Sequence, residues 1–344
     1  MEGRQRVFTM GKDGEGRRGI WEVLPSHTLL VKTRHKSGDF LLADSSRLIH
    51  ATEKKVHVIS LNNKEIQGAP YKWDEVIPIT DRFIVNGTAG FIMQDSLILL
   101  GGDGNPKRVL LLDFSTKKWQ TLSSMRTGRK GAALTKIDEN TILVLGGEDP
   151  KGMKLLANCE YFDTRSRGWS AFGNLKMPIP LSDHAVTVCN DYIYVSGGWD
   201  GRETAKDVWR SKLNGRGSWE RLPPLNKQRK NHGMVGDGAG KLSVIGGRFH
   251  RINREDIQVL ETEAFKVDEG SGWVPQGKLP LRRAWKATDM NIENALQARW
   301  LIVVELRELG LKRPDIEEAG KKLNLNRVII TMTLGRYLET GSTA

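Results

Sequence analysis

The sequence predicts an all-β fold, a six-bladed β-propeller, from two markers that recur in step and from the strand pattern between them. Paired glycines follow a short apolar run four times, with spacings of 45, 51 and 49 residues: Gly101-Gly102, Gly146-Gly147, Gly197-Gly198 and Gly246-Gly247. A tryptophan follows each pair, with spacings of 50, 50 and 54 residues: Trp119, Trp169, Trp219 and Trp273. Two independent markers that share one period indicate a repeated structural unit.

Each unit contains about four candidate strands. The runs that end in the glycine pairs, such as TILVLGG and YIYVSGG, are short and apolar, and turn residues such as IDEN precede them. One four-stranded sheet cannot bury both of its faces alone, so several sheets stack radially and the last must pair with the first. Glycine suits the crowded end of an inner strand, and tryptophan supplies apolar area between neighbouring blades.

The two ends of the repeat region have weaker markers. VHVISLNNKEIQ, from Val56, aligns with VLLLDFSTKKWQ, from Val109, so Ile66 takes the tryptophan position and FLLAD, residues 40–44, takes the position of the glycine-pair strand. We expect residues 1–305 to form the propeller, with a sixth blade shared between N-terminal and C-terminal strands. The N-terminal stretch should supply its two outer strands. The stretch from Lys286 through RWLIVVE should supply its two inner strands, which removes exposed sheet edges.

Residues 306–344 do not continue the repeat. Their pattern, with Pro314 at a helix start and Gly341 at a stop, predicts two short helices. These helices form either a tail that packs on the propeller or a partial helical module.

The repeated pattern resembles the kelch repeat, in which an apolar strand ends in a glycine pair and a strand such as YFD at residues 161–163, a tryptophan and a basic turn follow. The resemblance extends from Ser96 to about Trp285. It implies similarity to the kelch domain of BTB-kelch substrate adaptors of ubiquitin ligases, but we expect no BTB or BACK segment in this chain. It also implies protein partners, including a ubiquitin-ligase component.

Composition narrows the classes of partner and compartment. The 53 Lys+Arg and 41 Asp+Glu residues leave a formal net charge of +12, which favours acidic partners. Two cysteines can form at most one disulfide bond, which is too few cross-links to hold a chain of 344 residues together, so an oxidising compartment is not indicated. The N-terminus lacks the apolar run of a signal peptide, and no run reaches the roughly 20 residues of a membrane helix. We therefore expect a cytoplasmic or nuclear protein without a membrane partner.

Basic residues gather in two kinds of connection that a propeller places on one face. The segments that lead into inner strands contain MRTGRK, NKQRKNH and PLRRAWK, and the loops after the glycine pairs add further cations and a tryptophan. Guanidinium groups bind carboxylates in pairs of hydrogen bonds, and tryptophan is a frequent interface anchor. The sequence therefore predicts a non-catalytic scaffold that recognises acidic protein or peptide segments. Its candidate partner-binding residues are Arg126, Arg129, Lys130, Trp199, Arg229, Lys230, Arg248, Arg251, Arg282 and Arg283.

Three other interpretations stay open. The basic turns can be ordinary solvated surface, because Lys117, Lys118, Arg165, Arg167 and Arg216 give the opposite face positive charge as well. The net charge also suits a nucleic-acid-binding protein. The third is a sugar or sialic-acid enzyme, because some kelch propellers are oxidases or epimerases. Against it, no GxSxG, HExxH, P-loop or CxxC motif occurs, so no catalytic residue, metal or cofactor is expected. His184 and His232 precede inner strands, where packed structural histidines are expected.

Overall fold

The computed structural model describes residues 7–12, 17–24, 28–33, 39–44, 46–61, 71–79, 87–213, 218–237, 240–249, 257–270, 272–278 and 283–289. The larger of the chain's two units, Arg4–Asn291, contains every described residue. The predicted helical tail and RWLIVVE lie outside the described residues, and the boundary at residue 305 stays a prediction.

The larger unit contains six four-stranded antiparallel sheets, which we call blades and give here in the order of their strands. Blade 1 is β4 (Phe40–Ala43), β5 (Arg47–Ala51), β6 (Lys55–Ser60) and β7 (Glu75–Pro78). Blade 2 is β8 (Thr88–Met93), β9 (Ser96–Gly101), β10 (Val109–Asp113) and β11 (Lys118–Thr121). Blade 3 is β12 (Ala133–Asp138), β13 (Thr141–Leu145), β16 (Asn158–Asp163) and β17 (Gly168–Lys176).

The remaining sheets complete the set. Blade 4 is β18 (Ala185–Cys189), β19 (Tyr192–Ser196), β20 (Val208–Lys212) and β21 (Glu220–Leu222). Blade 5 is β22 (Gly233–Gly236), β23 (Lys241–Ile245), β26 (Glu261–Lys266) and β27 (Val274–Lys278). The shared blade is β28 (Arg283–Asp289), β1 (Val7–Lys12), β2 (Arg18–Leu24) and β3 (Thr28–Lys32). Two small hairpins, β14 (Glu148–Asp149) with β15 (Lys154–Leu155) and β24 (Arg248–Phe249) with β25 (Ile257–Gln258), extend from blades 3 and 5.

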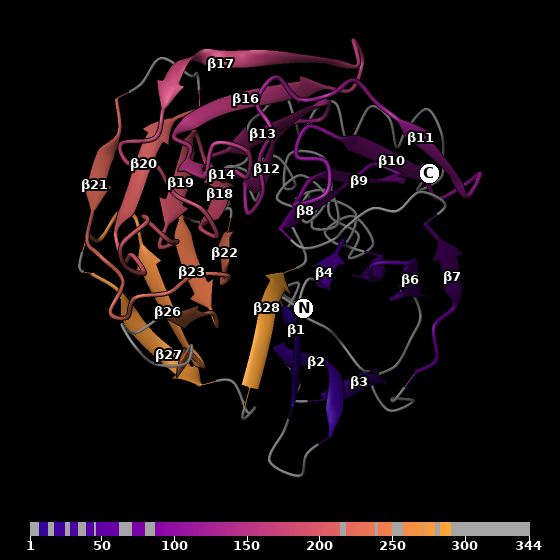
Figure 1. Cartoon of the computed structure of the whole chain (residues 1–344). Helices are drawn as coiled ribbons and strands as arrows, with labels where there is room; N and C mark the ends of the chain where they lie inside the picture. Colours follow the sequence, from indigo (N-terminus) through magenta and orange to yellow (C-terminus); the bar gives the residue numbers. More distant parts are fainter. Residues whose placement is uncertain are drawn as a thin grey trace, which may run out of the picture. The chain divides into compact units, whose positions relative to one another are not determined.

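The first strands of the six sheets form a closed ring. β4 contacts β8, β8 contacts β12, and the series continues through β18, β22 and β28 back to β4. Figure 1 shows these strands innermost, with the outer strands of each blade toward the periphery. This arrangement confirms the predicted six-bladed propeller. No helix among the described residues is long and apolar enough to cross a membrane.

The shared blade differs in its composition from the prediction. β1 pairs with β2 on one side and with β28 on the other, so the N-terminal stretch supplies three strands and residues 283–289 supply one. The prediction of two strands from each end was wrong, because β1 occupies the second position, which had been given to RWLIVVE. Trp21 consequently lies in β2, the third strand, and not in the outer strand.

Blade 1 also differs in register from the prediction. FLLA forms the innermost strand β4, and the second strand, which carries the glycine pair in other blades, is β5 with the sequence RLIHA. β6 pairs with β5 as β10 pairs with β9, so the alignment of VHVIS with VLLLD was correct. Ile66 lies outside the described residues, and the outer strand is β7.

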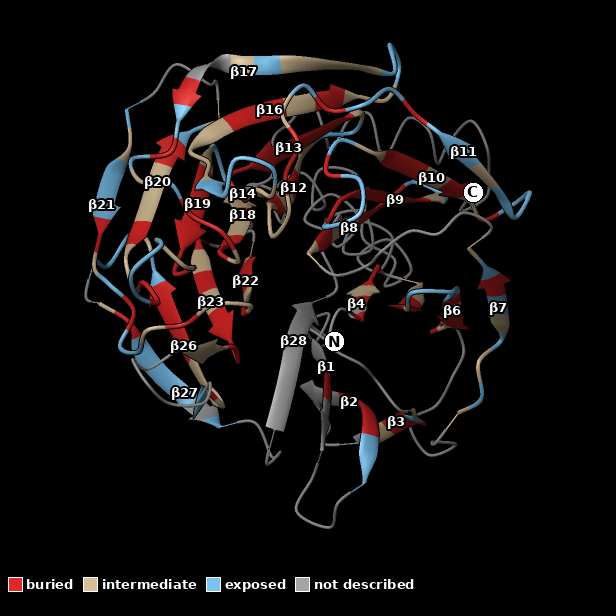
Figure 2. Ribbon diagram, in the orientation of Figure 1, coloured by how far each residue is buried: buried red, intermediate tan, exposed pale blue. Residues whose placement is uncertain are grey.

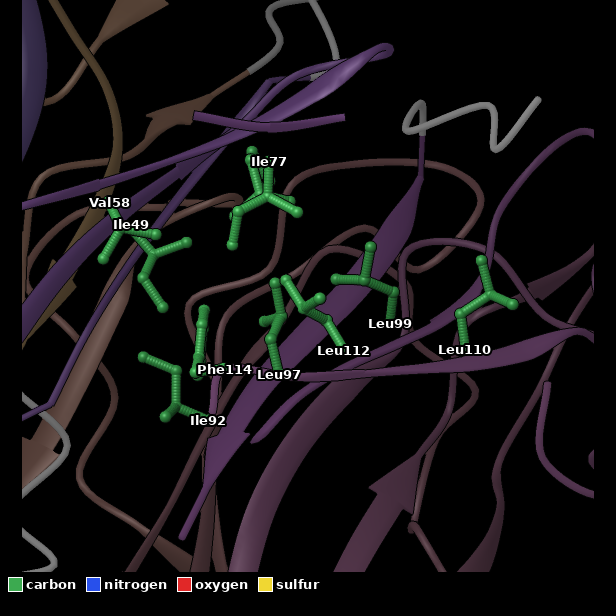
Figure 3. Close-up of a cluster of buried hydrophobic side chains, with 11 residues drawn as sticks. Ile49, Val58, Ile77, Ile92, Leu97, Leu99, Leu110, Leu112 and Phe114 are labelled. Carbon is green, nitrogen blue, oxygen red and sulfur yellow. The ribbon is translucent and has the colours of Figure 1, made fainter. Parts of the chain in front are cut away.

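The hydrophobic core lies between neighbouring blades. One cluster joins Ile49, Val58 and Ile77 of blade 1 to blade 2 side chains such as Leu97 and Leu112, and Figure 3 shows these side chains facing one another. Further clusters lie between blades 2 and 3, 3 and 4, and 4 and 5. Figure 2 shows buried residues concentrated on the second and third strands, as expected for sheets covered on both faces.

Three of the four periodic tryptophans join adjacent blades through a hydrogen bond. The indole Nε1 of Trp119 donates a 2.9 Å hydrogen bond to Pro78 O of the preceding blade, and Trp169 and Trp273 donate bonds of the same length to Ser123 O and Pro223 O. Each ring therefore supplies apolar area between blades, as predicted, and a directional bond as well.

Candidate functional site

The two kinds of connection meet at one face of the propeller. Lys130, which precedes the inner strand of blade 3, exchanges backbone hydrogen bonds of 2.9 and 2.8 Å with Glu148, which follows the glycine pair of the same blade. Ser182 and Trp199 in blade 4, and Lys230 and Arg248 in blade 5, are paired in the same way. This convergence was predicted. We call the surface made by residues 102–108, 122–132, 146–157, 177–184, 197–207, 223–232 and 247–249 the connection face.

The glycine pairs anchor the connections of the following blade. The N–H of Gly102 donates to Arg129 O, that of Gly147 to Leu181 O, and that of Gly198 to Arg229 O. At Gly101, φ is +68°, and an added Cβ would lie 2.2 Å from Arg129 O. Only glycine meets both conditions, which explains why this residue type keeps the period.

Arg129 and Arg229 are buried and do not contribute to an exposed basic ring. Both are 0% exposed, and each forms an ion pair with a buried carboxylate, Glu160 for Arg129 and Glu263 for Arg229. Their assignment as partner-binding residues was wrong. Burial lowers the pKa of both guanidinium groups, and the neighbouring carboxylate opposes that shift.

The hydrogen bonds of Arg129 show what it does instead. Its Nη1 donates to Gly146 O at 2.7 Å and to Asn158 O at 3.3 Å. Glu160 in turn accepts from the backbone N–H groups of Arg126 and Thr127, at 3.0 and 3.1 Å.

Arg229 repeats this arrangement with Gly246 O and Glu261 O, and Glu263 accepts from Asn226 N–H at 2.8 Å. These two buried pairs fix the shape of the connections that lead into blades 3 and 5.

Arg126 is exposed on one of these fixed connections. Three other predicted residues, Lys130, Trp199 and Lys230, also belong to the connection face. Lys130 Nζ lies 3.2 Å from Asp103 Oδ1 and 3.7 Å from Glu148 Oε1. Burial lowers the pKa of Lys130, but Asp103 and Glu148 outweigh it and raise the pKa. Lys230 Nζ lies 5.1 Å from the centre of the half-buried Trp199 ring, a cation–π contact.

The remaining predicted residues divide into described and undescribed positions. Arg248 is half-buried in β24. Arg283 begins β28, and Arg251 and Arg282 lie outside the described residues.

The charge of the connection face is mixed. Its exposed cations are Lys107, Arg126, Lys151, Lys154, Arg202, Lys206 and Lys227. Carboxylates are interspersed among them: Lys227 pairs with Glu261 at 2.7 Å, and Asp200 closes its own loop by accepting from Arg202 and Glu203 backbone N–H groups. The face therefore presents separated cations and not a continuous basic ring.

Met153 was missed by the sequence reasoning. It lies at the tip of the β14–β15 hairpin and is 86% exposed, with a φ of +45°. The hairpin leans on the loop that follows Trp199, because an added Cβ at Gly201 would touch Leu155 Cδ1 at 3.4 Å. The signal was the turn sequence DPKG at residues 149–152, which predicts a reversal and hence a projecting tip.

The buried histidines are packed against the glycine pairs. His184 Cβ would lie 2.7 Å from a Cβ at Gly198, and His232 occupies the same place beside Gly247. His232 Nε2 lies 2.8 Å from Ser196 Oγ. Burial, followed by the charge of Arg129, lowers the pKa of His184 to about 3. The described residues contain no group of His, Cys, Asp and Glu side chains that could hold a metal ion.

Comparison with known proteins agrees with this geometry. Rat Kelch-like protein 36 is 27% identical over 169 residues, which is 48% of this chain and 26% of the rat protein. Kelch repeat-containing protein kel-10 of Caenorhabditis elegans is 30% identical over 118 residues, 32% of this chain and 20% of that protein. Beta-scruin of Limulus polyphemus is 30% identical over 122 residues, 33% of this chain and 13% of its own length.

The chain thus spans about a quarter of the length of the Kelch-like relatives it matches. A family model, the KLHDC2/KLHL20/DRC7 Kelch-repeats domain, matches residues 87–291, which is more than half of the chain and covers blades 2 to 5 with β28. From the closed ring of blades, the glycine-anchored connections and this match, we conclude that the chain belongs to the KLHDC2/KLHL20/DRC7 Kelch-repeats domain family.

Proposed function

We propose that this chain is a non-catalytic protein-binding scaffold that holds acidic protein or peptide segments on its connection face. The proposal rests on the two buried ion pairs, Arg129–Glu160 and Arg229–Glu263, which hold the connections into blades 3 and 5 in one conformation. A preformed surface loses little conformational entropy when a partner binds.

Residues on the connection face supply the contacts for such a partner. Arg126 and Arg202 offer guanidinium forks for carboxylates, while Met153 and Trp199 offer apolar contact between them. Because the cations are separated by Asp103, Glu148 and Asp200, the proposed ligand carries spaced carboxylates and not a continuous acidic run.

Photocrosslinking from the connection face tests the proposal. One variant of the chain carries a photoreactive amino acid at Met153. A second variant carries it at Val274, which is 52% exposed on the outer strand of blade 5. Each protein is incubated with cell lysate, irradiated, and its crosslinked partners are identified by mass spectrometry. We expect discrete partners with acidic segments from Met153 and none of them from Val274.

A charge-reversal pair provides the matched control. Arg126→Glu with Arg202→Glu should abolish capture of those partners, whereas Lys212→Glu with Lys241→Glu, the same charge change at the opposite ends of strands, should leave capture intact. Equal capture by both double variants would refute the proposal. Capture that nuclease treatment abolishes would instead support a nucleic-acid-binding protein, and a ubiquitin-ligase component among the partners would extend the proposal to substrate delivery.

A further inference from the structure

A cavity of about 410 Å³ opens between blades 2 and 3 on the face opposite the connection face. Much of its lining comes from the turns that end the strands of both blades: Met93, Gln94, Ser96, Asp113, Thr116 and Lys118 of blade 2, and Asn140, Thr164, Arg165 and Arg167 of blade 3. The glycine pairs lie at the other ends of these strands, and of the lining residues only Leu122 belongs to the connection face.

The cavity carries an excess of positive charge. Lys118, Arg165 and Arg167 line it and are exposed, and Asp113 is the one carboxylate among the lining residues. Within the described part of the chain, Lys118 and Arg167 form no ion pair. Arg165 Nε lies 3.6 Å from Asp163 of its own turn, which leaves most of its donors available.

Asp113 forms no ion pair with these cations among the described residues; its carboxylate instead accepts hydrogen bonds within its own turn. Its Oδ1 accepts from Ser115 Oγ at 2.6 Å and from Thr116 N–H at 2.8 Å. These two hydrogen bonds lower the pKa of Asp113, the Ser115 bond most. Three cations line the cavity, and the two carboxylates beside them, Asp113 and the Asp163 partner of Arg165, leave an excess of one positive charge.

The floor of the cavity is apolar. Ile98 is 1% exposed, Leu122 is buried and Leu111 is half-buried. The side-chain amides of Gln120 and Asn140 also line the cavity. A site with an apolar floor, a few polar groups and a volume of this order is typical of small-ligand binding.

The turns around the cavity are held in place by neighbouring groups. Arg47 of blade 1 donates to Gln94 O at 3.0 Å and lies over the Phe114 ring at 4.5 Å. On the other side, Ser123 Oγ donates to Arg167 O at 2.6 Å. The cavity is therefore formed before any ligand arrives, which favours affinity.

Arg165 occupies a position of the repeat that is not basic in blades 2 and 5. The turn between the third and outer strands begins at Asp113 in blade 2, at Asp163 in blade 3 and at Lys266 in blade 5, because these residues pair with the first residues of β9, β13 and β23. The position of Arg165 is therefore taken by Asp268 in blade 5, and Glu269 follows it. Blade 2 has Ser115 at the same position, so a cation at the position of Arg165 is not a requirement of the fold.

We propose that this cavity binds a phosphate monoester, with its dianionic phosphate between Lys118, Arg165 and Arg167 and its apolar group on Ile98, Leu111 and Leu122. The local excess of positive charge favours an anion, and arginine pairs with phosphate through two parallel hydrogen bonds. The same chemistry is offered by a free small molecule and by a phosphorylated tyrosine side chain.

Phenyl phosphate is the probe, and binding to the full chain is measured by isothermal titration calorimetry. We expect saturable binding that weakens about tenfold when phenol, which lacks the charge, replaces it. Inorganic phosphate, which lacks the ring, should also bind more weakly. No saturable binding up to roughly 10 mM phenyl phosphate would overturn the proposal.

Two triple variants locate the site. Lys118→Gln with Arg165→Gln and Arg167→Gln should weaken phenyl phosphate binding by about tenfold or more. Lys107→Gln with Arg126→Gln and Arg202→Gln removes the same charge from the connection face and should leave the affinity unchanged. All six side chains are exposed, so both proteins should keep the melting temperature of the unmodified chain. Binding that is lost only in the second variant would contradict the assignment.

A peptide of glycine and serine with one central phosphotyrosine separates the two sources. Tighter binding of this peptide than of phenyl phosphate supports a phosphorylated protein segment as the ligand, and weaker binding supports a free phosphate monoester. In either case the first triple variant must lose the binding.

Discussion

Replacing Arg129 by methionine should cost a large part of the stability of the propeller. The substitution keeps an unbranched side chain in the space but removes the hydrogen bonds to Gly146 O and Asn158 O and the ion pair with Glu160. Glu160 then remains buried, with only the Arg126 and Thr127 N–H groups as donors. Breaking a buried pair from one side typically costs about 3–5 kcal/mol, so we expect the free energy of unfolding to fall by about 4 kcal/mol.

The pH dependence separates the two halves of the pair. A lone buried carboxylate is less costly when it carries a proton, so the penalty of Arg129→Met should shrink when the pH is lowered from 8 to 5.5. In Glu160→Gln the guanidinium of Arg129 remains charged at both values. The penalty of that variant should therefore persist unchanged.

Urea unfolding followed by tryptophan fluorescence at both pH values measures these differences. Arg126→Met is the matched control, because Arg126 is exposed three residues away, and it should change stability by less than about 0.5 kcal/mol. Arg129→Met with Glu160→Gln should cost less than the sum of the two single changes, since both charges leave together. Blade 4 already has the apolar pair Leu181 and Trp209 at these positions.

Two results would refute this reasoning. One is a cost below about 1 kcal/mol for Arg129→Met, which is the size expected of a surface ion pair. The other is strict additivity in the double variant.

Three further predictions follow from other contacts. His184 has a folded-state pKa of about 3 and an unfolded value near 6.5, so its contribution to the free energy of unfolding is complete above pH 6.5 and is lost as the pH falls toward 3; at pH 5 the loss is about 2 kcal/mol. His184→Ala, which copies Ala132 at the same place in blade 3, should therefore make the urea midpoint depend less on pH between pH 7 and 5. An unchanged dependence would contradict this prediction. Trp169→Phe removes the hydrogen bond to Ser123 O, whereas Trp219 Nε1 has no hydrogen-bond partner among the described residues. In urea titrations, Trp169→Phe should therefore lower the free energy of unfolding by about 1 kcal/mol more than Trp219→Phe. Equal losses would argue against a stabilising indole hydrogen bond. Gly101→Ala places a Cβ 2.2 Å from Arg129 O, whereas a Cβ at Gly270, where φ is +60°, would have no atom within 4 Å. Gly101→Ala should therefore lower the melting temperature far more than Gly270→Ala. Similar losses would show that φ alone limits these positions.

The fold was predictable where glycine and tryptophan mark the repeat. Gly101, Gly146, Gly197 and Gly246 have positive φ, and the first three approach the next connection too closely for a side chain, so the physical constraint is visible as a residue type. β5 and β1 end in Ala51 and Lys12 and carry no such mark. The positions of β5 and β1 within their blades follow from pairing with β6 and β28. No local sequence pattern encodes this pairing, and both positions were predicted wrongly.

The candidate site was less predictable, because buried and exposed arginines occur in the same basic turn. MRTGRK contains Arg126, which is exposed, and Arg129, which is fully buried with a partner 31 residues away. A comparison between repeats could have separated them. Blades 3 and 5 have both the arginine and a glutamate, Glu160 or Glu263, in the third strand, while blade 4 has Leu181 and Trp209 and therefore lacks both.

The pairing of β1 with β28 also sets the order in which this protein can be completed during synthesis. About 270 residues separate the two strands, so at 5–20 residues per second β1 waits roughly 15–55 seconds for its inner neighbour. Through that interval, β1 presents an unpaired strand edge while blades 1 to 5 are already being made. The nascent chain is therefore most exposed to strand exchange with other chains at its N-terminal hairpin, and the arrival of residues 283–289 ends that exposure.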